Sequence, residues 1–207
     1  MPRIAEARTA AEPSSPGQVE RRERILRAAA HIGAEKGLER VQMHEVAKDA
    51  GVAIGTLYRY FPSKTHLFTA VMADRVERFD ERTRSGPDPA AEPAEAVAQV
   101  LVSASRELLR KPTLAVAMLQ SSNTANAATV PDVGRIDRTF RGLILRVLGI
   151  RTPTAQDMAL VRLLLQLWYG VLQASLNARV SIVDAESDIR MGAELLLAPR
   201  SNSCDRN

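Results

Sequence analysis

The stretch from Val46 to Leu67, VAKDAGVAIGTLYRYFPSKTHL, constrains the fold of this chain more than any other. Small apolar residues give its first part a helical face, and Gly51 follows as a left-handed stop. After a short turn, Leu57 and Phe61 are spaced i, i+4, which places both on the buried face of a second short helix. Two short helices joined by a tight glycine turn are typical of a helix-turn-helix that reads DNA.

The second short helix is predicted to carry polar groups outward. With Leu57 and Phe61 turned inward, the side chains left on its outer face are Thr56, Tyr58, Arg59 and Tyr60. Pro62 then breaks the helical pattern, and Ser63 is placed to cap a third helix.

The run AGVAIGTLYRYFPSKTHL resembles the signature of the TetR family of transcriptional regulators, whose usual form is close to A-G-V-S-x-G-T-L-Y-x-H-F-x-S-K-x-x-L. The matching positions are Gly51, Val52, Gly55, Thr56, Leu57, Tyr58, Phe61, Ser63, Lys64 and Leu67. Ala53 replaces the usual capping Ser or Thr, which removes a cap worth about 1 kcal/mol. Tyr60 replaces a common His, and a phenol can still bond a phosphate but carries no charge near neutral pH. VQM and YRYFPSK are similar to TetR-type repressors of steroid and cholesterol catabolism.

The resemblance implies that the helix carrying Arg59 enters the major groove. Arg59 is predicted to read a base, because its planar fork bonds guanine O6 and N7 together; a phosphate contact is its competing role. Gly55 is expected to let the backbone approach the duplex closely. Side chains expected to face the DNA, mostly as phosphate contacts, are Gln42, His44, Thr56, Tyr58, Tyr60 and Lys64.

The first predicted helix begins at Val19 and ends at Gly37. Its first turns contain a cluster of basic residues, which have the wrong sign for a helix N-terminus. These residues are Arg21, Arg22, Arg24 and Arg27. A nearby phosphate backbone would compensate their charge, and solvated surface charge is the alternative; both interpretations stay open.

Composition favours a cytoplasmic protein without cofactor or metal. The chain has 207 residues and a net charge of +4, which favours a polyanionic partner only weakly. Its single cysteine, Cys204, lies in a polar tail, so no internal disulfide is expected. No apolar stretch resembling a signal peptide opens the chain, and Leu163–Leu176 is interpreted as too short and too polar to span a membrane.

Every periodic segment reads as helix, so we predict an all-α fold of about nine helices. Pro153 is expected in the first turn of one of them. The predicted parts are a disordered arm at 1–18, a three-helix DNA-binding domain at 19–66, a helical effector-binding and dimerisation domain at 67–198, and a disordered tail at 199–207. A loop is expected at Ser85–Pro93, and whether Arg3 and Arg8 of the arm contact a DNA groove stays open.

The segment Ala155–Ala178 is apolar around most of its circumference. Such a helix is predicted to bury against its own domain and against a second copy, together with a final helix at Asp184–Leu197. TetR-like proteins are similar, since their last two helices form a dimeric four-helix bundle, and a homodimer implies a near-palindromic operator. The predicted interface residues are Leu164, Val171, Leu172, Ser175, Ile189, Ala193 and Leu196.

A narrow polar stripe crosses the same segment at Arg162, Gln166, Tyr169, Gln173 and Asn177. It either faces water or supplies the few polar groups that orient a ligand in an apolar cavity. Candidate cavity residues are Leu101, Ser105, Met118, Leu119, Ser122, Gln166, Trp168, Tyr169 and Gln173. Their aliphatic character and Met118 favour a large apolar effector of the fatty acyl or steroid type, including a CoA thioester.

The leading hypothesis is a homodimeric repressor that an effector releases from its operator. The alternative is a dimeric DNA-binding protein whose C-terminal helices only dimerise. An enzyme is not expected, because the chain has no Gly-rich phosphate loop, no metal-ligand cluster, and no histidine in the predicted cavity region.

Overall fold

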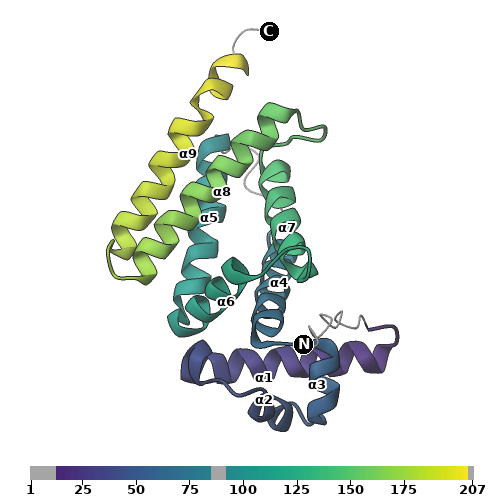
Figure 1. The fold of residues 1–207 in the computed structure, drawn as a ribbon. Helices are drawn as coiled ribbons and strands as arrows, with labels where there is room; N and C mark the ends of the chain where they lie inside the picture. The colour runs from purple at the N-terminus through teal and green to yellow at the C-terminus, as the bar shows by residue number, and fades with distance from the viewer. Residues whose placement is uncertain (1–12, 85–91, 205–207) are drawn as a thin grey trace, which may run out of the picture. The chain divides into compact units, whose positions relative to one another are not determined.

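A computed structural model describes residues 13–84 and 92–204 of the chain, with side chains up to residue 198 (Figure 1). The described residues form nine α-helices and no strand, so the prediction of an all-α fold is confirmed. They divide into two compact units, one formed by residues 13–76 and 111–136, the other by the remaining described residues. The division falls inside two helices, α4 (Lys64–Arg82) and α7 (Pro131–Val147).

The first unit is built on α1 (Pro16–Arg40), which packs against α2 (Met43–Asp49) on one side and α6 (Pro112–Thr124) on another (Figure 1). Helix α3 (Ile54–Tyr60) follows α2 after a short turn. Because Gly33 has no side chain, α1 approaches the buried ring of Phe68 on α4 closely. Gly37, where the sequence predicts that the helix ends, interrupts α1 with a φ of 73° in the left-handed region, but the helix continues beyond it to Arg40.

The turn between α2 and α3 is a Schellman motif. Gly51 has a φ of 63° and its N–H bonds the Lys48 carbonyl at 3.1 Å, while the Val52 N–H bonds the Ala47 carbonyl at 3.0 Å. Ala53 is the N-cap residue of α3 and provides no side-chain cap, as the sequence predicts. The hydroxyl of Ser63 accepts the His66 N–H at 3.3 Å and so caps α4.

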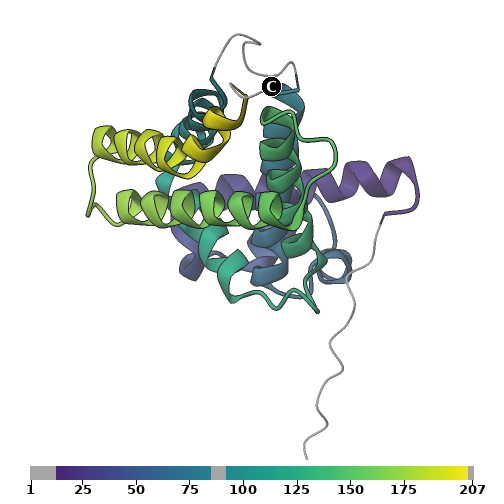
Figure 2. The same ribbon diagram turned by 90° about the horizontal axis from the view of Figure 1, so that it is seen from above.

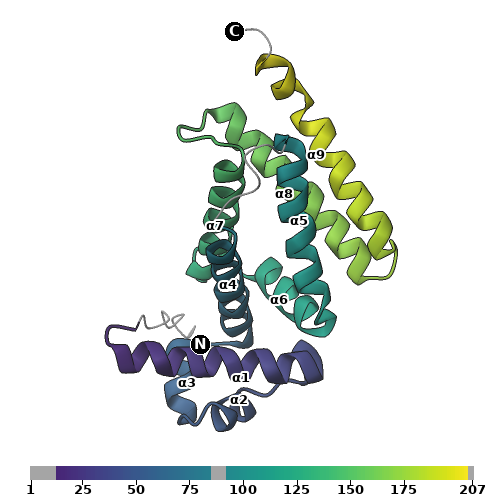
Figure 3. The ribbon, with the colours of Figure 1, turned by 180° about the vertical axis from the view of Figure 1, so that it is seen from behind.

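The second unit contains α5 (Pro93–Leu109), α8 (Ala155–Leu176) and α9 (Ile182–Cys204). Helix α9 packs against both α5 and α8 (Figures 2 and 3). Two ion pairs fasten α5 to α9. Arg106 bonds both carboxylate oxygens of Glu186 at 2.6 Å, and Arg190 bonds Glu95 at 2.6 Å. These arginines lower the pKa of the Glu186 and Glu95 carboxyl groups below the usual range.

Three predicted boundaries are wrong. Helix α1 begins at Pro16, inside the predicted disordered arm, while residues 1–12 with Arg3 and Arg8 lie outside the described residues. Helix α9 continues to Cys204 through the predicted tail. Pro153 lies before α8, because Thr154 is its N-cap and forms a reciprocal capping box with Asp157. The predicted loop residues 85–91 also lie outside the described part of the chain.

The segment Leu163–Leu176, which the sequence indicates is too short to span a membrane, is part of the longer helix α8. The helix has 22 residues, and by length and composition alone it is long and apolar enough to cross a membrane. Its most apolar 18-residue window has a mean hydropathy of 1.3, yet only 22% of that window is buried within the chain. Core helices of soluble proteins pass the same composition test, but they are mostly buried. Most of the other apolar side chains of α8 are half-buried, so its own chain covers the apolar surface of this helix only in part.

Candidate functional site

Helix α3 divides its side chains between the interior of the first unit and its surface. Leu57 and Phe61 are buried, as their spacing predicts, and they fix the orientation of the helix. Tyr58 is 43% exposed, Arg59 is exposed, and Thr56 is half-buried. The outward face of α3 therefore presents two hydroxyl groups and one guanidinium group.

Tyr60 differs from the prediction that it points outward. Its side chain is only 2% exposed, because positions 57, 60 and 61 fall on the same face of a helix. Its hydroxyl is buried and has no hydrogen-bond partner among the described residues. A direct phosphate contact from this hydroxyl is therefore not available in this conformation.

Gly55 lies at the start of α3 and is exposed. A Cβ added there would meet no atom of the chain within 4 Å, so packing inside the protein does not require glycine at this position. The expected reason for glycine, close approach of a duplex to the backbone, stays a prediction that this geometry allows.

The N-terminus of α2 presents Gln42 and His44, both exposed. Gln42 occupies the N-cap position without using its side chain as a cap, so the amide is left for another partner. Glu45 in the same turn bonds Lys36 of α1 at 2.8 Å, and this ammonium lowers the pKa of the Glu45 carboxyl. The contact holds the start of α2 against α1.

Lys64, which is predicted to contact a phosphate, bonds backbone carbonyls of its own chain. Its ammonium donates to the carbonyls of Leu38 at 3.3 Å and Glu39 at 3.0 Å, in the last turn of α1. A lysine at this place satisfies carbonyl groups that a helix end leaves without partners. In this structure Lys64 joins α4 to α1, and these two bonds leave one of its three N–H groups for a phosphate.

The arginines of α1 lie in its second to fourth turns, because the helix begins at Pro16. The argument from the helix dipole therefore does not apply to them. The guanidinium of Arg22 lies 5.4 Å from the centroid of the Phe61 ring and 3.9 Å from Asp132. Arg27 pairs with Glu23 at 3.5 Å, whereas Arg24 is exposed.

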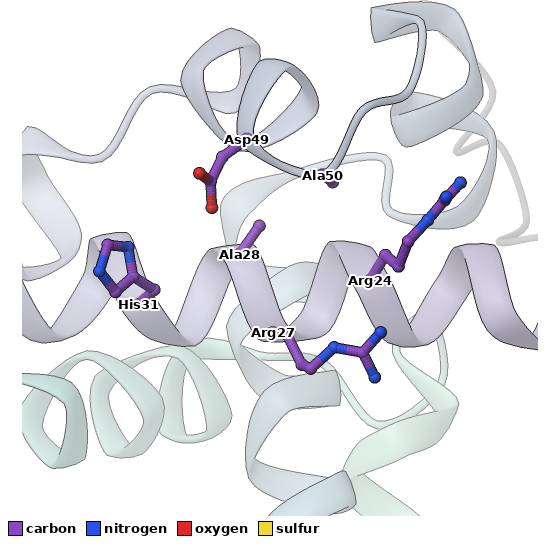
Figure 4. Close-up of a pocket in the computed structure, with 6 residues that line it drawn as sticks. All are labelled: Arg24, Arg27, Ala28, His31, Asp49 and Ala50. Carbon is purple, nitrogen blue, oxygen red and sulfur yellow. The ribbon is translucent and has the colours of Figure 1, made fainter.

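A groove of about 410 Å³ lies between α1 and the end of α2 (Figure 4). It is lined by Arg24, Arg27, Ala28, His31, Asp49 and Ala50. Figure 4 shows the Asp49 carboxylate on the side of the groove opposite the α1 side chains. Glu23 pairs with Arg27, and Glu35 lies 3.5 Å from His31, so acidic groups offset the basic ones. The sequence did not reveal this groove, and its mixed charge does not favour an anionic ligand.

The candidate effector residues are divided between the two units. Met118, Leu119 and Ser122 belong to the first unit, where Met118 and Leu119 are buried. The Ser122 hydroxyl donates to the Met118 carbonyl of its own helix at 2.9 Å. The other six residues belong to the second unit.

In the second unit, Trp168 and Ser105 are buried, and their polar groups are hydrogen-bonded to each other. The indole N–H of Trp168 donates to the Ser105 hydroxyl at 2.8 Å and to the Leu101 carbonyl at 3.1 Å, and the Phe140 ring lies 5.0 Å from the indole. This arrangement is typical of a core in which buried polar groups are paired. Trp168, Ser105 and Leu101 therefore stabilise the packing of α5 against α8.

The polar stripe of α8 is only partly sheltered. Arg162 and Gln166 are exposed, which favours contact with water at that end of the stripe. Tyr169 and Gln173 are half-buried, and the Gln173 amide donates to the Tyr169 hydroxyl at 2.5 Å. Of the candidate residues in the second unit, these two carry polar side chains that are half-buried rather than buried or exposed.

The predicted dimer residues also separate by burial. Leu164, Leu172, Ile189 and Ala193 are buried inside the second unit, so they have no surface left for a partner to cover. Val171, Ser175 and Leu196 are half-buried. The exposed apolar side chains of α8 and α9 are different residues, which periodicity missed: Leu163 at 48%, Ile182 at 53%, Val183 at 77%, Met191 at 55% and Leu195 at 71% exposure.

The three histidines do not form a metal site. Within the described residues no group of three or more His, Cys, Asp or Glu side chains is placed to hold a metal ion. His66 instead contacts Ser63 at 2.9 Å and the Thr129 carbonyl at 3.3 Å.

Comparison with known proteins identifies both parts of the chain. Residues 25–71 match the family of bacterial regulatory proteins of the tetR type, and residues 91–196 match the tetracyclin repressor-like C-terminal domain. The chain is 36% identical over 188 residues to the HTH-type transcriptional repressor KstR of Rhodococcus jostii (strain RHA1), which covers 91% of this chain and 88% of that protein.

Solved structures agree with this assignment. A crystal structure of a TetR transcriptional regulator from Rhodococcus sp. RHA1 matches with a TM-score of 0.82 and 57% identity, covering 87% of this chain and 97% of that one. Thermus thermophilus FadR, a TetR family transcriptional repressor solved in complex with lauroyl-CoA, has the same fold, with a TM-score of 0.64 and 20% identity over 85% of this chain and 93% of that one. The expectation of a regulator rather than an enzyme is confirmed by these families. The chain belongs to the TetR family of bacterial transcriptional regulators.

Proposed function

We propose that this protein is a homodimeric repressor that binds a near-palindromic operator and leaves it when a large apolar effector binds. The observation that carries the proposal is the division of α3, in which Leu57 and Phe61 are buried while Tyr58 and Arg59 are exposed. A short helix anchored in this way presents fixed side chains to a major groove.

Arg59 is assigned to base reading, and the other exposed groups to the phosphate backbone. The guanidinium fork of Arg59 matches guanine O6 and N7. Exposed or half-buried polar groups that can bond phosphates, and so fix the position of the protein along the duplex, belong to Tyr58, Thr56, Gln42 and His44. Neither Tyr60 nor Lys64 is included, because both make contacts inside the first unit.

The homodimer is supported by the uncovered apolar surface of α8 and α9. Leu163, Met191 and Leu195 are large apolar side chains that are all about half exposed or more. Such a surface favours a protein partner, and a two-fold axis lets the same surface of a second copy cover it. We therefore move the proposed interface from the buried residues to these exposed ones, with Val171, Ser175 and Leu196 at its edge.

The dimer proposal is tested by Leu195→Glu, which places a charge on the most exposed of these three side chains. We expect sedimentation to show a shift from dimer to monomer, with the helical content unchanged. Gln120→Glu adds the same charge to an exposed position of α6 and should leave the dimer intact. A dimer unaffected by Leu195→Glu would contradict an interface centred on this surface.

The effector is proposed to be an acyl or steroid compound, including a CoA thioester. Tyr169 and Gln173 are sheltered polar groups on a mostly apolar helix, a combination that suits an apolar ligand with one polar end. Two further facts support the proposal. A relative of 36% identity is the repressor KstR, and the same fold in Thermus thermophilus FadR is solved with lauroyl-CoA. The effector releases the operator only if it binds the DNA-incompetent state more tightly.

The experiment begins with an operator selected from a random duplex pool by the purified protein. Fluorescence anisotropy then measures binding to this operator and to single-base variants of it. Arg59→Ala is expected to weaken operator binding by about 1–3 kcal/mol and to relax the preference at one base pair of each half-site. Arg179→Ala removes the same charge from an exposed turn after α8 and is the control. Unchanged base preference in Arg59→Ala would remove Arg59 from base reading.

Effector release is tested by adding acyl-CoA thioesters and steroid thioesters of graded size to the preformed complex. We expect one chemical class to dissociate the complex at a stoichiometric concentration. A complex that resists every member, while binding the operator normally, would favour the alternative of a dimeric DNA-binding protein without small-molecule input.

A further inference from the structure

We propose that Tyr60 is a positioning residue for DNA reading: its buried ring is the platform on which the guanidinium of Arg59 stacks. This inference rests on the proposed base-reading role of Arg59. It replaces the phosphate contact expected of Tyr60 with a different role, which nothing in the signature of the motif indicates.

The geometry of the last turn of α3 carries the proposal. The guanidinium carbon of Arg59 lies 5.3 Å from the centroid of the Tyr60 ring. Neighbouring side chains of a helix normally diverge, so this contact requires the Arg59 chain to fold back across the ring. An arginine stacked on an aromatic face still offers the edge of its planar fork for hydrogen bonds, and stacking reduces its rotational freedom.

The Tyr60 ring lies beside a second buried ring. Its centroid lies 6.3 Å from that of Phe61, which is also buried. The Phe61 ring also contacts Arg22 of α1, whose guanidinium carbon lies 5.4 Å from the ring centroid, and Arg22 lies 3.9 Å from Asp132. Each of the two rings therefore contacts one arginine, and the platform is fixed to α1 rather than only to the short helix that carries it.

The burial of the Tyr60 hydroxyl separates the role of the ring from that of the oxygen. This hydroxyl has no partner among the described residues, so it contributes no hydrogen bond within the first unit. Replacing the hydroxyl by hydrogen keeps the ring and removes a buried polar group, whereas an aliphatic side chain fills the space without a π face. Phenylalanine and leucine at this position therefore have opposite expected effects.

The test compares Tyr60→Phe and Tyr60→Leu with Arg59→Ala, using the selected operator and its single-base variants. Tyr60→Phe should discriminate between bases as the wild type does. Tyr60→Leu should lose about two- to five-fold in discrimination, at the same base pair that Arg59→Ala affects, because an exposed cation–π contact is worth that factor. Preferences at the other base pairs and binding to a random duplex should not change.

Three outcomes overturn parts of this reasoning. If Arg59→Ala relaxes one base pair and Tyr60→Leu relaxes none, the positioning role fails and base reading by Arg59 stands. If Tyr60→Leu weakens every duplex equally, Tyr60 is only structural, and the positioning role fails. If Arg59→Ala changes no preference, base reading fails, and the role of Tyr60 fails with it.

A measurement on the wild type covers the case in which Tyr60→Leu does not fold. Protons of a guanidinium group stacked on a ring are shifted upfield by the ring current. We expect this shift for the Arg59 side chain in NMR spectra, with the signals assigned through Arg59→Lys. Arg59 signals at the values of an unstacked arginine would overturn the proposal.

Discussion

Gly33→Ala should destabilise the first unit although alanine is the better helix former. Gly33 lies inside α1, where a Cβ would stand 2.5 Å from Cε1 and 2.9 Å from Cζ of Phe68, and 3.2 Å from Cδ1 of Leu114. Both neighbours are buried, at 0% and 1% exposure, so neither has open space into which it can retreat. The methyl group therefore forces α1 away from α4 and α6.

Two opposing free-energy terms decide whether Gly33→Ala stabilises or destabilises the first unit. Replacing glycine by alanine in a helix interior stabilises by about 0.8–1.0 kcal/mol. Overpacking a well-filled core costs about 1–3 kcal/mol. Because two of the three contacts lie below 3.0 Å and involve a buried ring, we place the cost in the upper half of that range. The net loss in the free energy of unfolding is then about 1–2 kcal/mol.

Urea unfolding followed by circular dichroism measures this change, with Gly142→Ala as the matched control. Gly142 is exposed on α7, and a Cβ there meets nothing within 4 Å, so this control should gain up to about 1 kcal/mol. The reasoning is refuted if Gly33→Ala is as stable as the wild type, or if both variants shift in the same direction.

Two further predictions concern the second unit. Hydrogen bonds from Arg106 and Arg190 depress the pKa of Glu186 and Glu95, so their stabilisation is complete above the unfolded pKa of about 4.3 and is lost as pH falls through the lower folded pKa. Thermal unfolding from neutral to acid pH should therefore show a smaller acid-induced loss in Glu186→Gln than in the wild type, with Glu194→Gln on the exposed face of α9 as the control. Thr154→Ala removes the cap of α8 and should cost about 1 kcal/mol, or about 2–4 °C in the midpoint, whereas the exposed Thr152→Ala should not. An unchanged midpoint for Thr154→Ala would show that the capping box contributes nothing.

Local stop and cap signals made the first three helices predictable. Gly51 and Ser63 act on their immediate neighbours, so their roles can be read from a few residues, and the structure has both. Tyr60 was assigned wrongly because a seven-residue helix has too few positions to define its inner face by i, i+4 spacing alone. Tyr60 at i+3 and Phe61 at i+4 from Leu57 are both buried, and the i, i+4 spacing identifies only Phe61.

The proposed dimer surface could not be predicted from the sequence for a different reason. Helix α8 is apolar at most positions, so a helical projection shows that two sides need cover but not which arc faces α5 and α9. Only the packing shows that Leu164 is inside and Leu163 outside. The groove between α1 and α2 was missed because it joins Arg24 to Asp49, and no local pattern connects residues that far apart.

The contact between Lys64 and the end of α1 has a consequence for how the affinity should depend on ionic strength. Each phosphate that a basic side chain neutralises on B-DNA releases about 0.9 of a condensed counterion, and this number sets the slope of log affinity against log salt concentration. The bonds to the Leu38 and Glu39 carbonyls hold the Lys64 ammonium at the end of α1 and leave one of its three N–H groups for another partner. We expect Lys64 to stay at the end of α1, away from the phosphates, when the operator is bound, and the measured slope then reports about one counterion fewer per monomer than a count of the basic residues in the signature suggests.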